Sequence, residues 1–131
     1  MRGLNDSVLI VEDEFLIACG LKLQVEDIGL QVCAIAGSAD DAIAQAQLHR
    51  PMLVLMDMRL DGDKDGVDAA LAINETVGSK VIFITGSREP GTMDRIRMDH
   101  PSGVLIKPIS DTQLRTAIDA AIHGHGFLQA G

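Results

Sequence analysis

The chain has 131 residues, a length that suits one globular domain rather than two. Hydrophobic residues make up 47% of it, enough to build a core without a disulfide or a structural metal. Its 19 acidic residues outnumber 11 Lys and Arg, which gives a net charge of −8. This excess of acid argues against direct binding to nucleic acid or to an anionic membrane, because phosphate groups attract basic surfaces.

The sequence also argues against export or membrane insertion. No apolar run approaches the length of a membrane span, and residues 1–7 lack the apolar centre of a signal peptide. Cys19 and Cys33 have neither a paired nor a metal-binding spacing, and they suit small core residues in a reducing compartment. We therefore expect a cytoplasmic protein.

Five nearly continuous apolar runs predict five strands that are buried on both faces. The runs cover residues 8–11, 32–36, 52–56, 81–84 and 104–106. A helical pattern follows each run, so the order is (βα)5. Connections of this length predict parallel strands, and we expect an α/β fold with helices on both faces of one doubly wound sheet.

The helical patterns differ in strength. After the first run, Leu16, Cys19, Gly20 and Leu23 have the spacing of one helix face, which we expect to pack on the sheet. The segment 91–100, after the fourth run, is only weakly helical.

Capping residues mark two of the helices. Ser38 with Asp41 and Ser110 with Gln113 each have the spacing of a capping box. Pro51 ends the helix that begins near Ser38, because the residue before a proline disfavours helical geometry.

Polar side chains follow four of the five apolar runs. The first run ends in Glu12 and Asp13, the third in Asp57, the fourth in Thr85 and the fifth in Lys107. Ligands bind outside the carboxyl ends of the strands in an open parallel sheet. We therefore expect these side chains to converge on one edge of the sheet.

This combination of groups suits phosphoryl transfer. Neighbouring carboxylates repel one another unless a cation lies among them, and oxygen ligands without a dedicated cage suit Mg²⁺. A carboxylate beside Mg²⁺ can attack a phosphoryl group, while Mg²⁺ and a lysine neutralise charge on its oxygens. A threonine hydroxyl can donate a further hydrogen bond. Every chemical role of a phospho-aspartate site is filled.

The segments VLIVEDE, LVLMDMRL, VIFITG and GVLIKP, in this order, resemble the receiver domain of two-component response regulators. The similarity covers residues 7–122, so we expect a receiver domain over 1–122 and a short C-terminal tail over 123–131. It implies the flavodoxin-like strand order 2-1-3-4-5. It further implies a sensor histidine kinase or a histidine phosphotransfer protein as donor, an unidentified output partner, and a monomer or weak homodimer.

The resemblance assigns the metal and acceptor roles. Asp57 would be the phosphoacceptor, and Mg²⁺ would bind to Asp57, to Asp13, to Glu12 mainly through water, and to the backbone carbonyl of Arg59. Arg59 and Ser87 fall where relatives tune hydrolysis of the phosphoryl group. The loop after Asp57 resembles that of alphaproteobacterial receivers, and we expect either a single-domain receiver of that type or a domain of a larger regulator or hybrid kinase.

The resemblance also assigns the switch. Lys107 would pair with Asp57 and then with the phosphoryl group, Thr85 would supply the switch hydroxyl, and Pro108 would follow a cis peptide. Relatives carry Tyr or Phe where this chain has Val104, and that ring moves with the threonine. Because Val104 has no ring, we expect the loop 86–91 and its weak helix to carry the signal instead.

Other functions share parts of this pattern. A Mg²⁺-dependent phosphohydrolase of the haloacid dehalogenase type would need a second aspartate where this chain has Arg59. A flavodoxin-like cofactor site would need a phosphate-binding loop where Glu12 and Asp13 would repel phosphate. Residues 61–66 resemble the start of an EF-hand loop, but Ala72 stands where a bidentate glutamate is required. We expect a signalling domain that catalyses only its own phosphorylation and dephosphorylation, with an acidic turn at 61–65 before the next helix.

Overall fold

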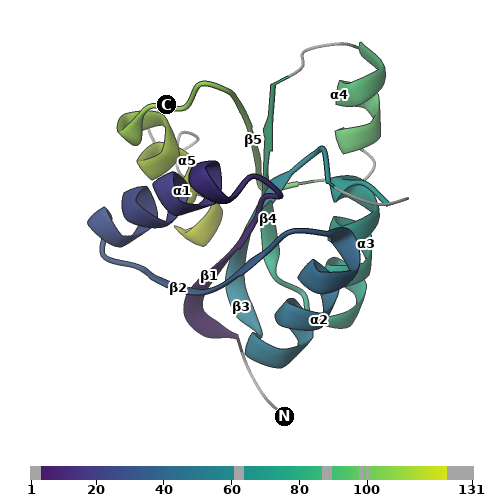
Figure 1. The fold of residues 1–131 in the computed structure, drawn as a ribbon, viewed down its shortest axis with the longest axis horizontal. Coiled ribbons are helices and arrows are strands. Elements are labelled where there is room, and N and C mark those ends of the chain that lie inside the picture. The colour runs from purple at the N-terminus through teal and green to yellow at the C-terminus, as the bar shows by residue number, and fades with distance from the viewer. Residues whose placement is uncertain (1–3, 61–63, 87–89, 98, 100, 124–131) are drawn as a thin grey trace.

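Five parallel strands form one sheet in the order β2-β1-β3-β4-β5, which confirms the expected topology (Figure 1). The computed structural model describes residues 4–60, 64–86, 90–97, 99 and 101–123. In chain order the elements are β1 (Asn5–Val11), α1 (Phe15–Asp27), β2 (Gln31–Ala36), α2 (Ala39–His49), β3 (Pro51–Asp57), α3 (Gly66–Thr76), β4 (Lys80–Thr85), α4 (Pro90–Arg97), β5 (Gly103–Ile106) and α5 (Asp111–His123).

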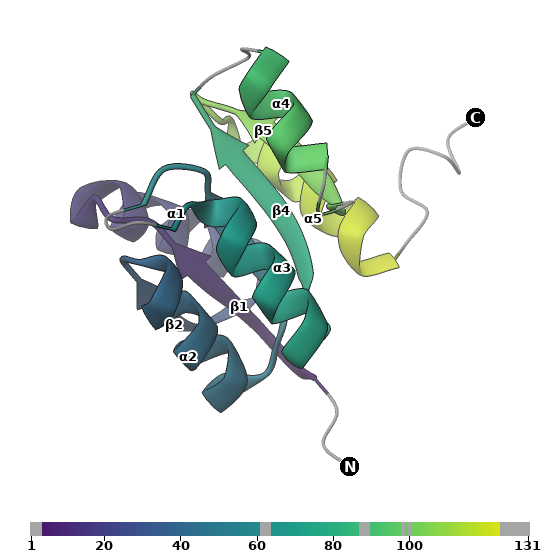
Figure 2. The ribbon, with the colours of Figure 1, turned by 90° about the vertical axis from the view of Figure 1, so that its right-hand side faces the viewer.

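Helices cover both faces of the sheet, as the continuous apolar runs predicted. Helices α1 and α5 lie on one face, and α2, α3 and α4 lie on the other (Figures 1 and 2). Successive strand residues point to opposite faces, so Val8 and Ile10 join the cluster under α1 and α5. Leu9 and Val11 join the cluster under the other three helices. None of the described helices is long and apolar enough to cross a membrane.

The predicted caps form, one of them in part. The Ser38 hydroxyl accepts a hydrogen bond from the Asp41 backbone N–H at 3.1 Å, but the Asp41 carboxylate accepts from Gln45 rather than closing the box. Ser110 and Gln113 form both bonds of a capping box, at 3.1 and 2.9 Å. These caps fix where α2 and α5 begin.

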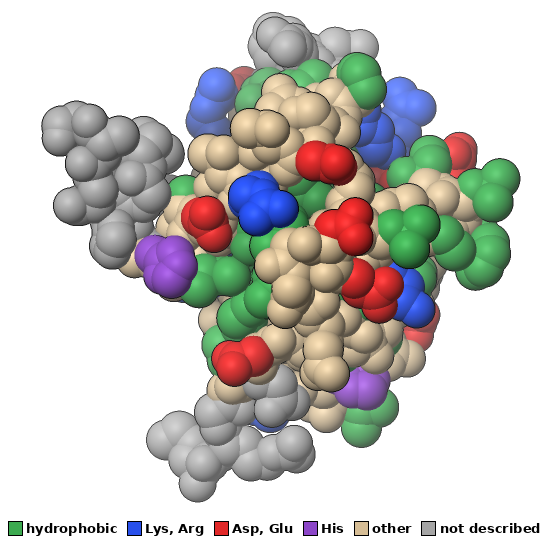
Figure 3. Space-filling view, turned by 90° about the vertical axis from the view of Figure 1, so that its left-hand side faces the viewer, with side chains coloured by type: hydrophobic (Ala, Val, Ile, Leu, Met, Phe, Trp, Pro, Cys, Tyr) green, Lys and Arg blue, Asp and Glu red, His purple; other side chains and the backbone are tan. Residues whose placement is uncertain are grey.

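The predicted inner face of α1 is wrong, although the helix itself is present. Leu16 is 83% exposed and Leu23 is 64% exposed, whereas Ala18, Leu21 and Val25 are buried against the sheet. Apolar residues occur on both sides of this helix, so spacing alone did not distinguish the packed side from the exposed one. In Figure 3, which shows the side of the molecule that carries α1 and α5, hydrophobic side chains stand out from the surface at one edge.

The weak helical pattern after β4 corresponds to α4, which runs from Pro90 to Arg97. Residues 98 and 100 of the predicted segment lie outside the described residues. At the end of the chain, α5 continues to His123, and the rest of the predicted tail lies outside the described residues. The boundary between domain and tail therefore stays a prediction.

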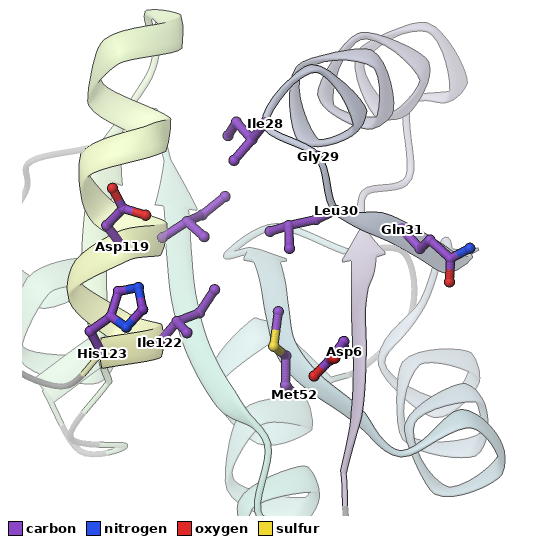
Figure 4. A pocket seen from close by; sticks show the side chains of 10 residues that line it. Asp6, Ile28, Gly29, Leu30, Gln31, Met52, Asp119, Ile122 and His123 are labelled. Carbon is purple, nitrogen blue, oxygen red and sulfur yellow. The ribbon is translucent and has the colours of Figure 1, made fainter.

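A cavity of about 540 Å³ lies at the amino ends of the strands (Figure 4). Leu30 and Met52 line it from the sheet side, and Ile122 lines it from α5. Asp119 and His123 belong to the same lining. The polar residues that follow the strands lie at the opposite end of the sheet, so this cavity is separate from them.

The packing of α1 can be tested with two leucines of the same helix. We expect Leu21→Ala to lower the free energy of unfolding by about 2–5 kcal/mol, because it removes buried methyl groups and leaves a cavity. Leu23→Ala should change it by about 0.5 kcal/mol or less, because this side chain is 64% exposed. Urea unfolding followed by circular dichroism measures both, and the reverse ranking would mean that the face predicted from the sequence is the packed one.

Candidate functional site

The five polar residues expected at the strand ends converge on one edge of the sheet. Glu12 and Asp13 follow β1, Asp57 ends β3, Thr85 ends β4 and Lys107 follows β5. These four strands are neighbours in the sheet, so their carboxyl ends lie side by side. Carboxylate oxygens of Glu12, Asp13 and Asp57 lie within 4.8 Å of one another.

Two of the three carboxylates are buried and share one lysine. Glu12 is 3% exposed and Asp57 is 7% exposed, whereas Asp13 is exposed to solvent. The Lys107 Nζ lies 3.3 Å from Glu12 Oε1 and 3.3 Å from Asp57 Oδ2. Three carboxylates thus face a single ammonium group within the described site, and negative charge is in surplus.

Burial and the neighbouring charges change the protonation of Glu12. Burial above all, together with the hydrogen bond to Asp57 and the charge of Asp57, raises the pKa of Glu12 to about 7, although the Glu14 N–H and the charge of Lys107 act to lower it. Burial lowers the pKa of Lys107, but the charges of Asp57 and Glu12 raise it more, so the net shift is upward. Because three carboxylates share a single ammonium group, the site favours binding of a further cation.

Backbone hydrogen bonds hold the acids in place. The Glu12 N–H donates to the Ala36 carbonyl at 2.9 Å, which continues the pairing of β1 with β2 beyond the strand. The Glu14 N–H donates to Glu12 Oε2 at 3.2 Å. The Arg59 N–H donates to Asp57 Oδ1 at 3.0 Å. Both acids are therefore oriented before any ligand arrives.

Thr85 and Lys107 are linked through the backbone. Thr85 is 2% exposed, and its carbonyl accepts a hydrogen bond from the Lys107 N–H at 2.8 Å. The Lys107–Pro108 peptide is cis, as the resemblance implied. Val104 is half-buried and packs into the cluster between the sheet and α2, α3 and α4.

The donor set fits a hard divalent cation. Carboxylate oxygens from Glu12, Asp13 and Asp57 surround one small space, and oxygen ligands of this kind suit Mg²⁺, which retains several waters. Arg59 lies next to the cluster through its bond to Asp57, and its carbonyl as a fourth ligand stays a prediction. Ser87 and residues 61–63 of the expected acidic turn lie outside the described residues.

Helix α3 begins in direct contact with the backbone of Asp57. The Gly66 N–H donates to the Met58 carbonyl at 3.0 Å. A Cβ atom at position 66 would lie 2.3 Å from the Asp57 carbonyl oxygen and 3.1 Å from its carbonyl carbon. Only glycine allows the first turn of α3 to approach Asp57 this closely.

A guanidinium from α4 holds the cap of α3, a contact that the sequence analysis did not find. Asp65 is the N-cap of α3 and forms a reciprocal capping box with Asp68. Arg95 donates from Nε to Asp65 Oδ2 at 3.1 Å, from Nη2 to Asp65 Oδ1 at 3.1 Å, and from Nη2 to Asp68 Oδ1 at 2.7 Å. The Asp-x-x-Asp spacing could have revealed the box, but no local signal links it to an arginine 30 residues further on.

Comparison with known proteins assigns the family. Residues 8–119 match the model of the response regulator receiver domain. The transcriptional regulatory protein PdtaR of Mycobacterium tuberculosis is 33% identical over 115 residues, which are 88% of this chain and 56% of that protein. The phyllosphere-induced regulator PhyR of Methylorubrum extorquens is 33% identical over 117 residues, 88% of this chain and 43% of that protein. The chain thus spans about half the length of these curated relatives.

Solved structures agree with this assignment. The signal receiver domain of a modulated diguanylate cyclase from Desulfovibrio desulfuricans G20 has a TM-score of 0.85 and 35% identity, over 94% of this chain and 97% of that one. The PhyR receiver domain of Erythrobacter litoralis has a TM-score of 0.78 and 30% identity, over 92% of each chain. The strand order, the residues at the strand ends and these matches lead to one conclusion: the chain belongs to the response regulator receiver domain family.

Proposed function

We propose that this domain accepts a phosphoryl group on Asp57 with the help of Mg²⁺ and thereby changes its affinity for a partner. The observation that supports this most is the grouping of Glu12, Asp13 and Asp57 oxygens within 4.8 Å, with Lys107 bonded to two of the acids. Glu12, Asp13, Asp57 and the Arg59 carbonyl would hold the metal. When bound, Mg²⁺ would neutralise charge on the carboxylates and on the phosphoryl oxygens.

The side chains around Asp57 suit its role as nucleophile. Arg59 N–H binds Oδ1 and Lys107 binds Oδ2, so the carboxylate is held in one orientation. A carboxylate oxygen attacks phosphorus, an O–P bond forms, and the bond from phosphorus to the donor breaks. With a phosphohistidine donor the electron pair of the broken bond stays on the imidazole nitrogen. Lys107 then pairs with a phosphoryl oxygen, because its ammonium already lies 3.3 Å from the acceptor carboxylate.

Thr85 would respond to the phosphoryl group on Asp57. It ends β4, the strand that pairs with β3, where Asp57 lies opposite Ile84, the residue before Thr85. A hydroxyl that donates to a phosphoryl oxygen would favour one arrangement of the β4–α4 connection over another. Phosphorylation would thus shift a conformational equilibrium rather than create a new structure.

The surroundings of the site suit a protein donor. Helix α1 starts immediately after the acids and exposes Phe15 and Leu16, 72% and 83% accessible, to solvent. An apolar surface beside the acceptor suits docking of a sensor histidine kinase or a histidine phosphotransfer protein. The domain would act as a cytoplasmic signalling module that catalyses only its own phosphorylation and dephosphorylation. The phosphohydrolase alternative is weaker because Arg59 stands where that chemistry needs a second acid.

Phosphorylation of Asp57 can be tested directly with a small donor. Incubation with acetyl phosphate and Mg²⁺ should add the mass of one phosphoryl group to the wild type, measured by intact-protein mass spectrometry. Asp57→Asn should remain unmodified because its amide is a poor nucleophile, whereas Asp27→Asn, a change at an exposed aspartate at the end of α1, should behave as the wild type. Equal modification of wild type and Asp57→Asn, or none in the wild type, would refute the proposal.

A proton on Glu12 should compete with Mg²⁺ for the site, which can be tested through the pH dependence of Mg²⁺ binding. Because the pKa of Glu12 is about 7, the apo site holds a proton at pH 6 that Mg²⁺ must displace. We expect Mg²⁺ affinity to rise about tenfold from pH 6 to pH 8, and this rise to be much smaller in Glu12→Gln. The same raised pKa stabilises the apo fold below about pH 4.5, and that contribution is lost as the pH rises through 7. Isothermal titration calorimetry measures the affinities, and equal pH dependence in both proteins would contradict the assignment.

A further inference from the structure

Helix α4 is attached to the rest of the molecule by few buried groups. Among its described side chains, Ile96 is buried, Thr92, Met93 and Arg95 are half-buried, and Asp94 and Arg97 are exposed. Ile96 and Met93 join the hydrophobic cluster under α2, α3 and α4. Arg95 connects α4 to α3 through hydrogen bonds to Asp65 and Asp68. The Arg95 guanidinium thus adds a polar contact to the apolar packing of Ile96 and Met93 that holds α4 on the sheet.

The residues that Arg95 contacts connect it to the backbone of Asp57. Nε and Nη2 of Arg95 donate hydrogen bonds to Asp65, and Nη2 also donates to Asp68, over distances of 2.7–3.1 Å. Asp65 and Asp68 cap α3 by binding each other's backbone N–H groups at 3.0 Å. The next residue, Gly66, lies against the Asp57 carbonyl with no room for a Cβ and donates to the Met58 carbonyl. A displacement of the Asp57 backbone, or of the loop that follows it, would therefore move the first turn of α3 and change its contact with Arg95.

We propose that Arg95 is a positioning residue that couples α4 to Asp57 through the capped first turn of α3. This inference rests on the proposed function, since phosphorylation is the event that would use the coupling. In one state, Arg95 binds the cap and holds both α4 and the loop after Asp57. In the other, the loop has adjusted to metal and phosphoryl group, the cap has shifted, and Arg95 has released it.

The packing of β5 leaves room for such a route. Val104 is half-buried in an aliphatic cluster and has no ring that could swing between two positions. Arg95, by contrast, is a long side chain with 33% of its surface exposed, and it can exchange carboxylate partners for water at small cost. Because Arg95 binds Asp65 through two nitrogens, its contact with the cap of α3 has one defined geometry. Because the guanidinium is partly exposed, that contact can break and form again.

The coupling has a quantitative consequence. If Mg²⁺ binding changes the opening equilibrium of α4 by some factor, then freeing α4 must change Mg²⁺ affinity by the same factor. Such factors are typically about 5–150. A side chain that only stabilised the fold would not link these two quantities.

Three variants test the proposal in the full chain. Arg95→Met removes the charge but keeps the length of the side chain, and Arg95→Lys keeps the charge but loses the fork. Arg97→Met is the matched control, because Arg97 lies on the same helix, is 68% exposed, and pairs with Asp94 of its own helix. Amide hydrogen exchange across residues 91–97 is measured in the apo, Mg²⁺-bound and acetyl-phosphate-treated proteins. Calorimetry gives the Mg²⁺ affinity of each.

In the wild type and in Arg97→Met, phosphorylation should change α4 exchange at least about fivefold. In Arg95→Met, Asp57 should still be phosphorylated and α4 should exchange rapidly in every state. Its Mg²⁺ affinity should differ from that of the wild type by the factor by which Mg²⁺ binding changes α4 exchange in the wild type. Arg95→Lys should restore part of the response. The coupling is refuted, and the proposed function is not, if phosphorylation changes α4 exchange as much in Arg95→Met as in the wild type, or if it leaves α4 exchange unchanged in a phosphorylated wild type. A wild type that is never phosphorylated overturns the proposed function itself.

Discussion

Burial of the sheet on both faces is the constraint on which the rest of this molecule depends. Residues 53–56 of β3 are at most 1% exposed, and their side chains alternate between the two hydrophobic clusters. A strand in that position can carry no polar side chain along its length without leaving it unsatisfied. Polar chemistry is therefore confined to the points where strands end, and parallel strands all end at the same edge. Asp57 and Thr85 are the residues with which β3 and β4 end at that edge, and both carry polar side chains.

At that edge the charges do not balance, and the imbalance explains the properties of the site. Lys107 offsets part of the charge of Glu12 and Asp57, while Asp13 lies in solvent. Glu12 responds with a raised pKa, chiefly because burial disfavours its charged form. Any added positive charge would stabilise these carboxylates. Backbone hydrogen bonds keep Glu12 and Asp57 oriented before a cation binds. Readiness for a cation is thus built into the apo protein.

The sequence predicted the parts of the structure that local rules determine. Strand order followed from the family resemblance, the convergence of Glu12, Asp57 and Lys107 from the alternation of strands and helices, and the cap at Ser110 from its spacing to Gln113. It failed on α1, because FLIACGLKL is apolar on more than one side and only tertiary packing selects Leu21 over Leu23. The contact of Arg95 with Asp65 was also beyond reach, since it depends on how α4 lies against α3. The Asp65–Asp68 box was within reach and was overlooked.

The exposed leucines of α1 also affect how the protein behaves in concentrated solution. Phe15, Leu16 and Leu23 present apolar surface to water, which favours contact between copies of the chain. Long-range repulsion from a net charge of −8 opposes that contact at neutral pH and low ionic strength. Salt screens this repulsion over about 10 Å at 0.1 M, and acid removes it by protonating carboxylates. Colloidal stability therefore depends on the 19 acidic residues of the chain taken together, so conditions that neutralise them also favour self-association.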